Sequence, residues 1–189
     1  LQRLARADAL RGLAGHRRQQ TWVATGQHRQ APLLTAAPQR EAPLALPEAA
    51  EGEEIVLDYA ATGLTLRRHP LALLRPRLAR RGWRNARQLE SLRDGASAWA
   101  CGIVVMRQQP ETAKGTIFVT LEDETGSVNV IVWRSVREAQ RQALLASRLL
   151  AVGGQWQRSA EGVMHLIAHE LRDVTHWLGR LGTQSRDFH

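Results

Sequence analysis

The segment Gly115-Thr-Ile-Phe-Val-Thr-Leu-Glu-Asp-Glu-Thr-Gly-Ser-Val-Asn-Val-Ile-Val132 decides the fold class. Its first half alternates, with Ile117, Val119 and Leu121 on one face and more polar side chains on the other. Valines repeat the two-residue period after a turn at 124–127. Two alternating runs joined by a short turn that contains glycine predict a β-hairpin with one buried face.

Three further strands and one helix are predicted around this hairpin. Residues 99–107 form an apolar run that contains Gly102, and such a glycine often marks a bulge where a small barrel turns its corner. Residues 134–145 have helical periodicity, and residues 148–157 and 163–174 are again predicted as strands. The predicted fold class is therefore α+β, with a five-stranded OB barrel at residues 96–175.

The chain of 189 residues has a formal net charge of +8, which is unevenly distributed. The predicted barrel holds eight basic and eight acidic residues, whereas residues 54–95 hold nine basic and four acidic ones. All basic residues but Lys114 are arginine, which suits planar, bidentate contact with phosphate. The single cysteine gives no disulfide framework and no apolar run reaches membrane-spanning length, so a cytoplasmic location is predicted.

The remaining residues fall into four predicted segments. Residues 1–26 predict short helices joined through small residues; such a hairpin often holds a nucleic-acid backbone, although the ragged end of a truncated domain fits equally well. Residues 27–53 contain four prolines and no periodicity, which predicts a flexible linker. Residues 54–95 predict a basic helical connector, with one helix from residue 54 and a cationic one after His69. Residues 176–189 predict a C-terminal helix and tail.

No arrangement of residues predicts catalysis in this chain. Glu122, Asp123 and Glu124 are consecutive and diverge at the end of a strand, so we interpret them as a charged hairpin edge and not as a site for divalent metal. His165 and His169 are separated by ~13 Å along a strand, which is too far for one zinc ion. We therefore predict a non-catalytic segment that holds no metal and no cofactor.

The predicted nucleic-acid interface combines the outward face of the second and third strands with nearby loops and the basic connector. OB barrels bind oligonucleotides across that face, and aromatic side chains stack on bases of any sequence. Phe118 is the first candidate for stacking, while Trp133 is either a second one or is buried against the following helix. A protein-docking surface that includes exposed Ile131 is the alternative. The candidate residues are Arg67, Arg68, Arg75, Arg77, Arg80, Arg81, Arg107, Lys114, Phe118, Asn129, Trp133 and Arg158.

Four sequence blocks resemble a known family. They are Leu4-Ala-Arg-Ala-Asp-Ala-Leu10, Asp58-Tyr-Ala-Ala-Thr-Gly-Leu-Thr-Leu-Arg-Arg-His-Pro-Leu71, Thr112-Ala-Lys-Gly-Thr-Ile-Phe-Val-Thr-Leu-Glu-Asp-Glu-Thr-Gly126 and Ser185-Arg-Asp-Phe188. In this order they are similar to the C-terminal region of bacterial error-prone DNA polymerases, C-family enzymes related to the DNA polymerase III α subunit. The resemblance covers the whole chain except the linker.

The resemblance implies a longer parent protein that is a DNA-directed DNA polymerase acting in translesion synthesis and induced mutagenesis. Its catalytic aspartates and the Mg²⁺ they need would lie outside this chain. Residues 1–26 would end a tandem helix-hairpin-helix domain, and the barrel would lie near single-stranded template DNA. The implied partners are single-stranded DNA and the mutasome accessory proteins, namely an inactive Y-family-like protein and a RecA-like protein.

Overall fold

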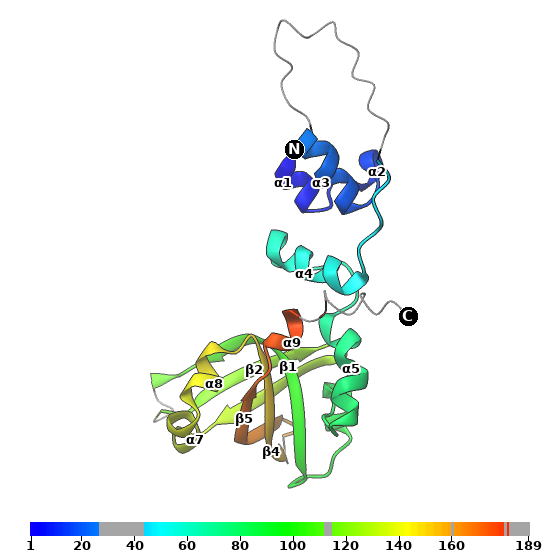
Figure 1. Cartoon of the computed structure of the whole chain (residues 1–189). Coiled ribbons are helices and arrows are strands. Elements are labelled where there is room, and N and C mark those ends of the chain that lie inside the picture. The colour runs from blue at the N-terminus through cyan, green and yellow to red at the C-terminus, as the bar shows by residue number, and fades with distance from the viewer. Residues whose placement is uncertain (27–43, 112–114, 160, 180, 182–189) are drawn as a thin grey trace, which may run out of the picture. The chain divides into compact units, whose positions relative to one another are not determined.

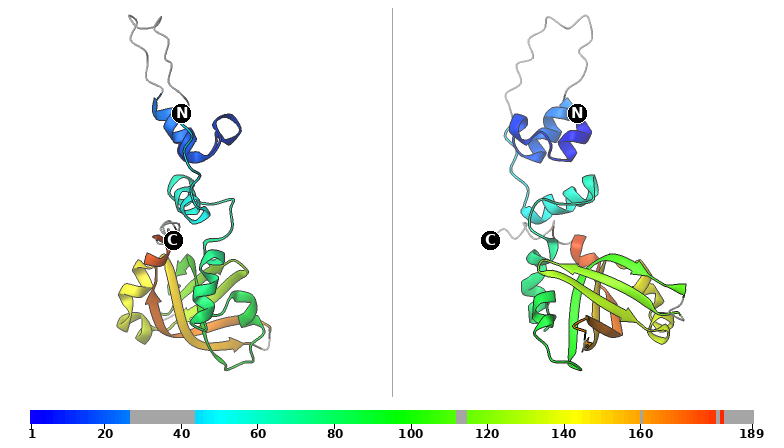
Figure 2. Two further views of the ribbon diagram at one scale, coloured as in Figure 1. Left: turned by 45° about the vertical axis from the view of Figure 1, so that its right-hand side comes forward. Right: turned by 180° about the vertical axis from the view of Figure 1, so that it is seen from behind.

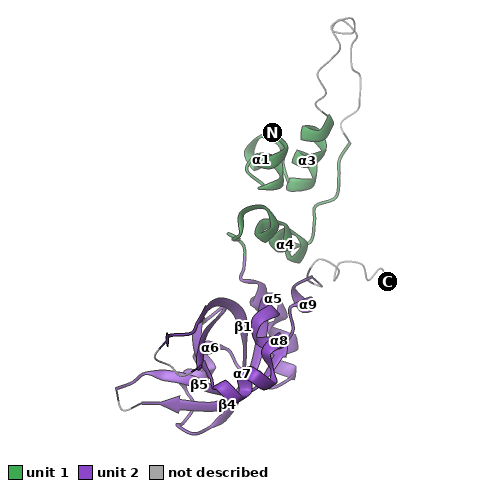
Figure 3. Ribbon diagram, turned by 90° about the vertical axis from the view of Figure 1, so that its left-hand side faces the viewer, with its two compact units in different colours: residues 1–67, 182–189 green, residues 68–181 purple. Residues whose placement is uncertain are grey.

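A computed structural model describes residues 1–26, 44–111, 115–159, 161–179 and 181. The chain forms two compact units, with the boundary between Arg67 and Arg68 (Figure 3). This boundary lies inside the segment 54–95 that the sequence presents as one connector. Most of the predicted linker, residues 27–43, lies outside the described residues, as do residues 182–189 of the predicted tail.

The first unit contains the helices α1 (Gln2–Arg6), α2 (Arg11–Ala14), α3 (Arg17–Gly26) and α4 (Glu51–Thr62). Helix α4 begins three residues before the predicted start, so residues 51–53 are helical and do not belong to an extended linker. Three glutamates in its first turn favour this start because they interact well with the positive end of the helix dipole. The helix ends at Gly63, whose φ of 78° lies in the left-handed region that glycine tolerates.

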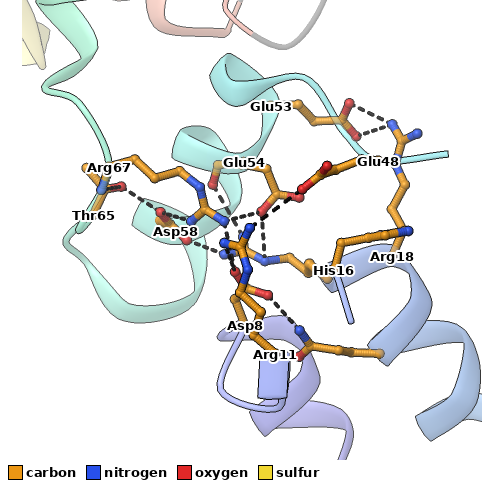
Figure 4. Close-up of polar contacts among 12 residues, drawn as sticks. Asp8, Arg11, His16, Arg18, Glu48, Glu53, Glu54, Asp58, Thr65 and Arg67 are labelled. Carbon is orange, nitrogen blue, oxygen red and sulfur yellow. Dashed lines mark hydrogen bonds and ion pairs between the residues drawn. The ribbon is translucent and has the colours of Figure 1, made fainter. Parts of the chain in front are cut away.

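A buried ion cluster holds α4 and the following loop against α1 and α3 (Figure 4). The Arg67 guanidinium donates to Asp58 at 2.7 Å, to Asp8 at 2.8 Å and to Glu54 at 3.0 Å. Arg17, which is 3% exposed, pairs with Asp58 and lies 3.3 Å from Glu54. Two guanidiniums thus share three carboxylates in a place where an unpaired charge would be costly.

The two buried carboxyl groups of α4 have pKa values shifted in opposite directions. Burial raises the pKa of Glu54 more than Arg17 and Arg67 lower it. Burial alone would also raise the pKa of Asp58, but hydrogen bonds from Thr65, Arg17 and Arg67 outweigh it and the pKa is lowered. The first unit therefore derives stability from the ionised form of Asp58.

The second unit is built on a closed barrel of five strands with the order β1-β2-β3-β5-β4, which confirms the predicted fold (Figure 1). Strands β3 and β5 pair in parallel and all other pairs are antiparallel. Valine and leucine side chains of β2, β3, β4 and β5 meet Ala98 and Ala100 of β1 inside the barrel. The strands are β1 (Ser97–Gln108), β2 (Ile117–Asp123), β3 (Gly126–Val132), β4 (Leu149–Arg158) and β5 (Met164–Asp173).

The helix predicted at 134–145 is divided into α7 (Arg134–Ala139) and α8 (Arg141–Ala146), with Gln140 between them. The Gln140 side chain explains the break, because it makes two hydrogen bonds to the backbone of β5. Its amide nitrogen donates to the carbonyl of His169 at 3.0 Å, and its amide oxygen accepts from the N–H of Leu171 at 2.7 Å. This contact attaches the two short helices to the barrel.

Close backbone packing, and not a bulge, accounts for the glycine predicted to turn the first strand. The irregular pairing of β1 lies between Val104 and Met106, while a Cβ at Gly102 would lie 2.7 Å from the Cβ of Leu121. A second tight approach occurs between β4 and β5, where a Cβ at Gly154 would lie 1.9 Å from the carbonyl oxygen of Ile167. Both positions exclude any side chain.

Helix α5 (Pro70–Arg80) packs on the barrel unit through three leucines, and α6 (Ala86–Glu90) adds Ala86 and Leu89 to the barrel core. The acidic turn between β2 and β3 fixes both helices. Glu124 accepts from the Arg75 guanidinium at 2.8 Å, and Asp123 accepts from the N–H of Ala86 at 2.7 Å. The charged hairpin edge therefore attaches α5 and α6 to the barrel. Figure 2 shows α5 against the barrel from two further sides.

We predict that Gly154→Ala lowers the stability of the barrel by about 3 kcal/mol, because the added methyl group must displace the backbone of β5. Chemical unfolding monitored by tryptophan fluorescence measures the change. Gly179→Ala is the matched control, since nothing lies within 4 Å of its added Cβ. Equal stability of the two variants would contradict the tight β4–β5 approach.

We also predict that Asp58→Asn destabilises the first unit by about 3 kcal/mol at pH 7, because two arginines lose their shared carboxylate. The contribution of Asp58 is complete above the pKa of about 3.9 that aspartate has in an unfolded chain, and it is lost as the pH falls through the lowered native pKa. Amide hydrogen exchange in α4 measures both effects. Faster exchange at pH 7 and a flatter acid dependence are expected, and an unchanged acid dependence would refute the assignment.

Candidate nucleic-acid interface

The outer surface of β1, β2 and β3 carries two exposed aromatic rings. Phe118 is 40% exposed and Trp133 is 50% exposed. Phe118 is paired with Ile131 across β2 and β3, and Thr120 is paired with Asn129 on one side and Met106 on the other. We call this surface the aromatic face and define it by Met106, Phe118, Asn129, Ile131 and Trp133.

The barrel core determines which side chains form the aromatic face. Val119 and Leu121 of β2 and Val130 and Val132 of β3 are buried inside the barrel. Because successive side chains of a strand point to opposite faces, the residues between and after them must point outward. The sequence alternation thus correctly predicted that Phe118 and Asn129 lie on one surface. It left Trp133 undecided, and the structure places this ring at the surface.

Two arginines that sequence reasoning did not select lie at the end of the aromatic face. Arg137 donates to the carbonyl of Gly115 at 3.1 Å, directly before β2, and a Cβ at Gly115 would lie 3.4 Å from the side chain of Arg134. Arg134 also pairs with Glu138 at 2.8 Å. In the sequence, both arginines follow closely after Trp133 at the start of the predicted helix, and this position could have identified them as candidates.

The loop residues predicted to join the interface have other contacts. Arg107 donates to the carbonyl of Leu144 at 2.7 Å and to that of Ser147, and burial lowers the pKa of its guanidinium. The guanidinium of Arg158 donates to the carbonyl of Glu90 at 2.5 Å. Arg107 therefore connects β1 to α8, and Arg158 connects β4 to α6. Lys114 lies outside the described residues.

The arginines predicted to act together in the connector are distributed over both units. Arg67 is held in the ion cluster of the first unit. Arg68 begins the second unit, where Arg75 pairs with Glu124. Arg80 is exposed at the end of α5. Arg77 and Arg81 lie over the ring of Trp177 in α9 (His176–Gly179), at 3.9 Å and 5.1 Å from its centroid.

The structure does not bring the connector arginines to the aromatic face. Arg75 contacts the turn after β2, whereas Phe118 lies near the start of this strand. Five residues of extended strand correspond to ~17 Å between the two positions. The single surface predicted from the sequence is therefore divided: Arg67 belongs to the first unit, and on the second unit the aromatic face and the arginines of α5 lie at different places.

The described residues also bear on metal binding and on membrane insertion. There, no group of three or more His, Cys, Asp or Glu side chains is arranged to hold a metal ion. Within the same residues, no helix has both the length and the apolar character needed to cross a membrane.

Residues 86–174 match the tRNA_anti-codon family, described as an OB-fold nucleic acid binding domain. The chain is 52% identical over 188 residues to the error-prone DNA polymerase of Methylococcus capsulatus, covering 100% of this chain and 18% of that protein. It is 53% identical over 186 residues to that of Azoarcus sp., covering 98% of this chain and 17% of that protein. Among solved structures, asparaginyl-tRNA synthetase from Pyrococcus horikoshii is 23% identical with a TM-score of 0.37, covering 43% of this chain and 20% of that chain.

These relatives confirm the resemblance carried by the four sequence blocks. The chain spans less than one fifth of the length of the curated relatives that it matches. The matched family region begins at Ala86 and ends at Val174, so it contains α6 and all five strands of the barrel. By sequence the chain therefore belongs with the error-prone DNA polymerases, of which it matches one region, and its barrel matches the family described as an OB-fold nucleic acid binding domain.

Proposed function

We propose that the aromatic face binds single-stranded DNA without sequence preference. The observation that carries this proposal is a pair of exposed aromatic rings. Phe118 lies on the outer surface of β2, and Trp133 directly follows β3. Every base has a π-face, so stacking on an exposed ring does not depend on sequence. Asn129 of β3 is exposed on the same face, and its side chain can both donate and accept hydrogen bonds.

The charge of the barrel sets the expected strength of this binding. The segment 96–175 is neutral by formal charge, and among the described residues Arg134 and Arg137 lie at the end of the aromatic face. Binding dominated by phosphate contacts needs many local cations. Stacking contributes roughly 1–3 kcal/mol per base. We therefore expect modest affinity that depends on the aromatic rings and is moderately sensitive to salt.

The function of the longer protein is part of the same proposal. The relatives named error-prone DNA polymerase support a role for this region within a DNA-directed DNA polymerase. In that setting the aromatic face would hold the unpaired template strand during translesion synthesis, and catalysis with Mg²⁺ would take place outside this chain. The region itself would be non-catalytic.

We predict that Phe118→Ala and Trp133→Ala each weaken binding of fluorescently labelled oligo(dT) by about tenfold, because each removes one stacking ring worth roughly 1–3 kcal/mol. Fluorescence anisotropy at 50 and 150 mM NaCl measures the dissociation constants. Leu145→Ala is the matched control, since Leu145 is 51% exposed but belongs to α8. Wild-type affinity in both ring variants would refute the proposal.

The composition of the aromatic face also favours a second candidate, docking of a mutasome accessory protein. Met106 and Ile131 contribute apolar surface beside the two rings, as in the core of many protein interfaces. Titration of the chain with the inactive Y-family-like protein and with the RecA-like protein, each with and without oligo(dT), separates the candidates. If Phe118→Ala abolishes protein binding but leaves oligo(dT) binding unchanged, docking is the function of this face.

A further inference from the structure

Three tryptophans from distant parts of the chain form a stack on the side of the barrel made by β1, β4 and β5. The ring of Trp83 lies 5.6 Å from that of Trp99 in β1 and 5.6 Å from that of Trp177 in α9, measured between centroids. The interplanar angles are 12° and 14°, so the rings are nearly parallel. Trp83 and Trp177 are 5% and 3% exposed.

Arginines cover the stack on both sides. Arg172 of β5 lies 4.5 Å from the centroid of Trp99, and Arg77 lies 3.9 Å from that of Trp177. Arg81 lies over both Trp177 and Trp83, at 5.1 Å and 5.6 Å. We call these three tryptophans and three arginines the Trp–Arg ladder.

Stacking orients the guanidinium of Arg81, an exposed arginine of the ladder, for a particular kind of ligand. A planar guanidinium that rests its face on an indole keeps the N–H groups on its edge, which is the geometry for bidentate contact with phosphate. The stacked position also reduces the side-chain freedom that binding would otherwise remove. The indole faces are covered by neighbouring rings or by guanidiniums, so they offer no open surface on which a base can stack.

A cleft of about 350 Å³ lies next to the ladder, lined by Arg84, Trp99, Gly153, Gly154, His169 and Glu170. Arg84 is fixed at its backbone, where its N–H donates to the carbonyl of Trp99 at 2.8 Å. Its guanidinium is exposed and, among the described residues, has no hydrogen-bond or ion-pair partner. The acid in the cleft, Glu170, is paired with Arg172 at 2.7 Å, which offsets its repulsion of an anion.

We propose that Arg81 of the Trp–Arg ladder, together with Arg84, binds the phosphate backbone of duplex DNA. A duplex presents phosphates and hides its bases in the stack, which matches a surface with oriented cations and no open aromatic ring. Trp99 lies near the start of β1 and Arg172 near the end of β5, whereas the aromatic face is formed by β2, β3 and Met106 near the end of β1. The inference rests on the proposed binding of nucleic acid by this unit, but it assigns a different form of DNA to a different surface.

The test compares Arg81→Gln/Arg84→Gln with the wild-type full chain. Binding of a labelled 16-bp duplex and of oligo(dT) is measured by anisotropy across a salt series. We expect duplex affinity to fall about tenfold and the slope of log K against log salt to become shallower by about 2, since ~0.9 is lost for each phosphate contact removed. Affinity for oligo(dT) should change less than twofold. Arg81→Lys keeps the charge but not the planar group, and an intermediate loss is expected.

Two controls keep the test decisive. Arg141→Gln/Arg148→Gln removes the same charge from exposed positions on α8 and before β4, and it should leave duplex affinity within twofold of wild type. Near-ultraviolet circular dichroism checks that the tryptophan stack remains in the ladder variant. Unchanged duplex affinity in Arg81→Gln/Arg84→Gln, or an equal loss in the control variant, overturns the inference. If oligo(dT) does not bind at all but the duplex result holds, the single-strand proposal fails and the ladder proposal stands.

Discussion

The arrangement of the second unit depends on one buried carboxylate, that of Asp123. It accepts hydrogen bonds from the N–H groups of Thr125 at 2.7 Å and Gly126 at 3.1 Å, which close the turn between β2 and β3. It also accepts from the N–H of Ala86 at 2.7 Å, where α6 begins, and lies 3.6 Å from Arg75 of α5. A buried carboxylate without such partners would be strongly destabilising, so the turn, α5 and α6 must be held together.

This constraint explains why the two candidate surfaces are separate. Because Arg75 of α5 is held at the β2–β3 turn, the helix and the loop after it extend over the other strands of the barrel, where Trp83 stacks on Trp99. The arginines that follow Arg75 are thereby directed to Trp177. Within the described residues, the cations that contact Gly115, just before β2 at the end of the aromatic face, are Arg134 and Arg137 of α7.

Local patterns predicted the barrel, because burial of one strand face leaves a two-residue period that a sequence displays directly. Val119 and Leu121 inside therefore required Phe118 outside. The sequence shows no comparable local pattern for the acidic residues that pair with the arginines. A count of charges in residues 64–87 shows eight arginines without an acid, but Arg67 also pairs with Asp8 and Arg75 pairs with Glu124, both far away in the sequence. Long-range ion pairing is set by the fold, so a local charge count overestimates the cations left for a ligand.

The same reasoning explains why identical residue types serve different purposes on the two surfaces. Phe118 and Trp133 leave ring surface open, and an open ring can receive an unpaired base. Trp83 and Trp177 leave almost none, and a covered ring can only orient the cation above it. A single strand exposes its bases, whereas a duplex exposes mainly its phosphates. If both proposals hold, one small barrel distinguishes the two forms of DNA by whether its aromatic rings are open or covered, without reading any base sequence.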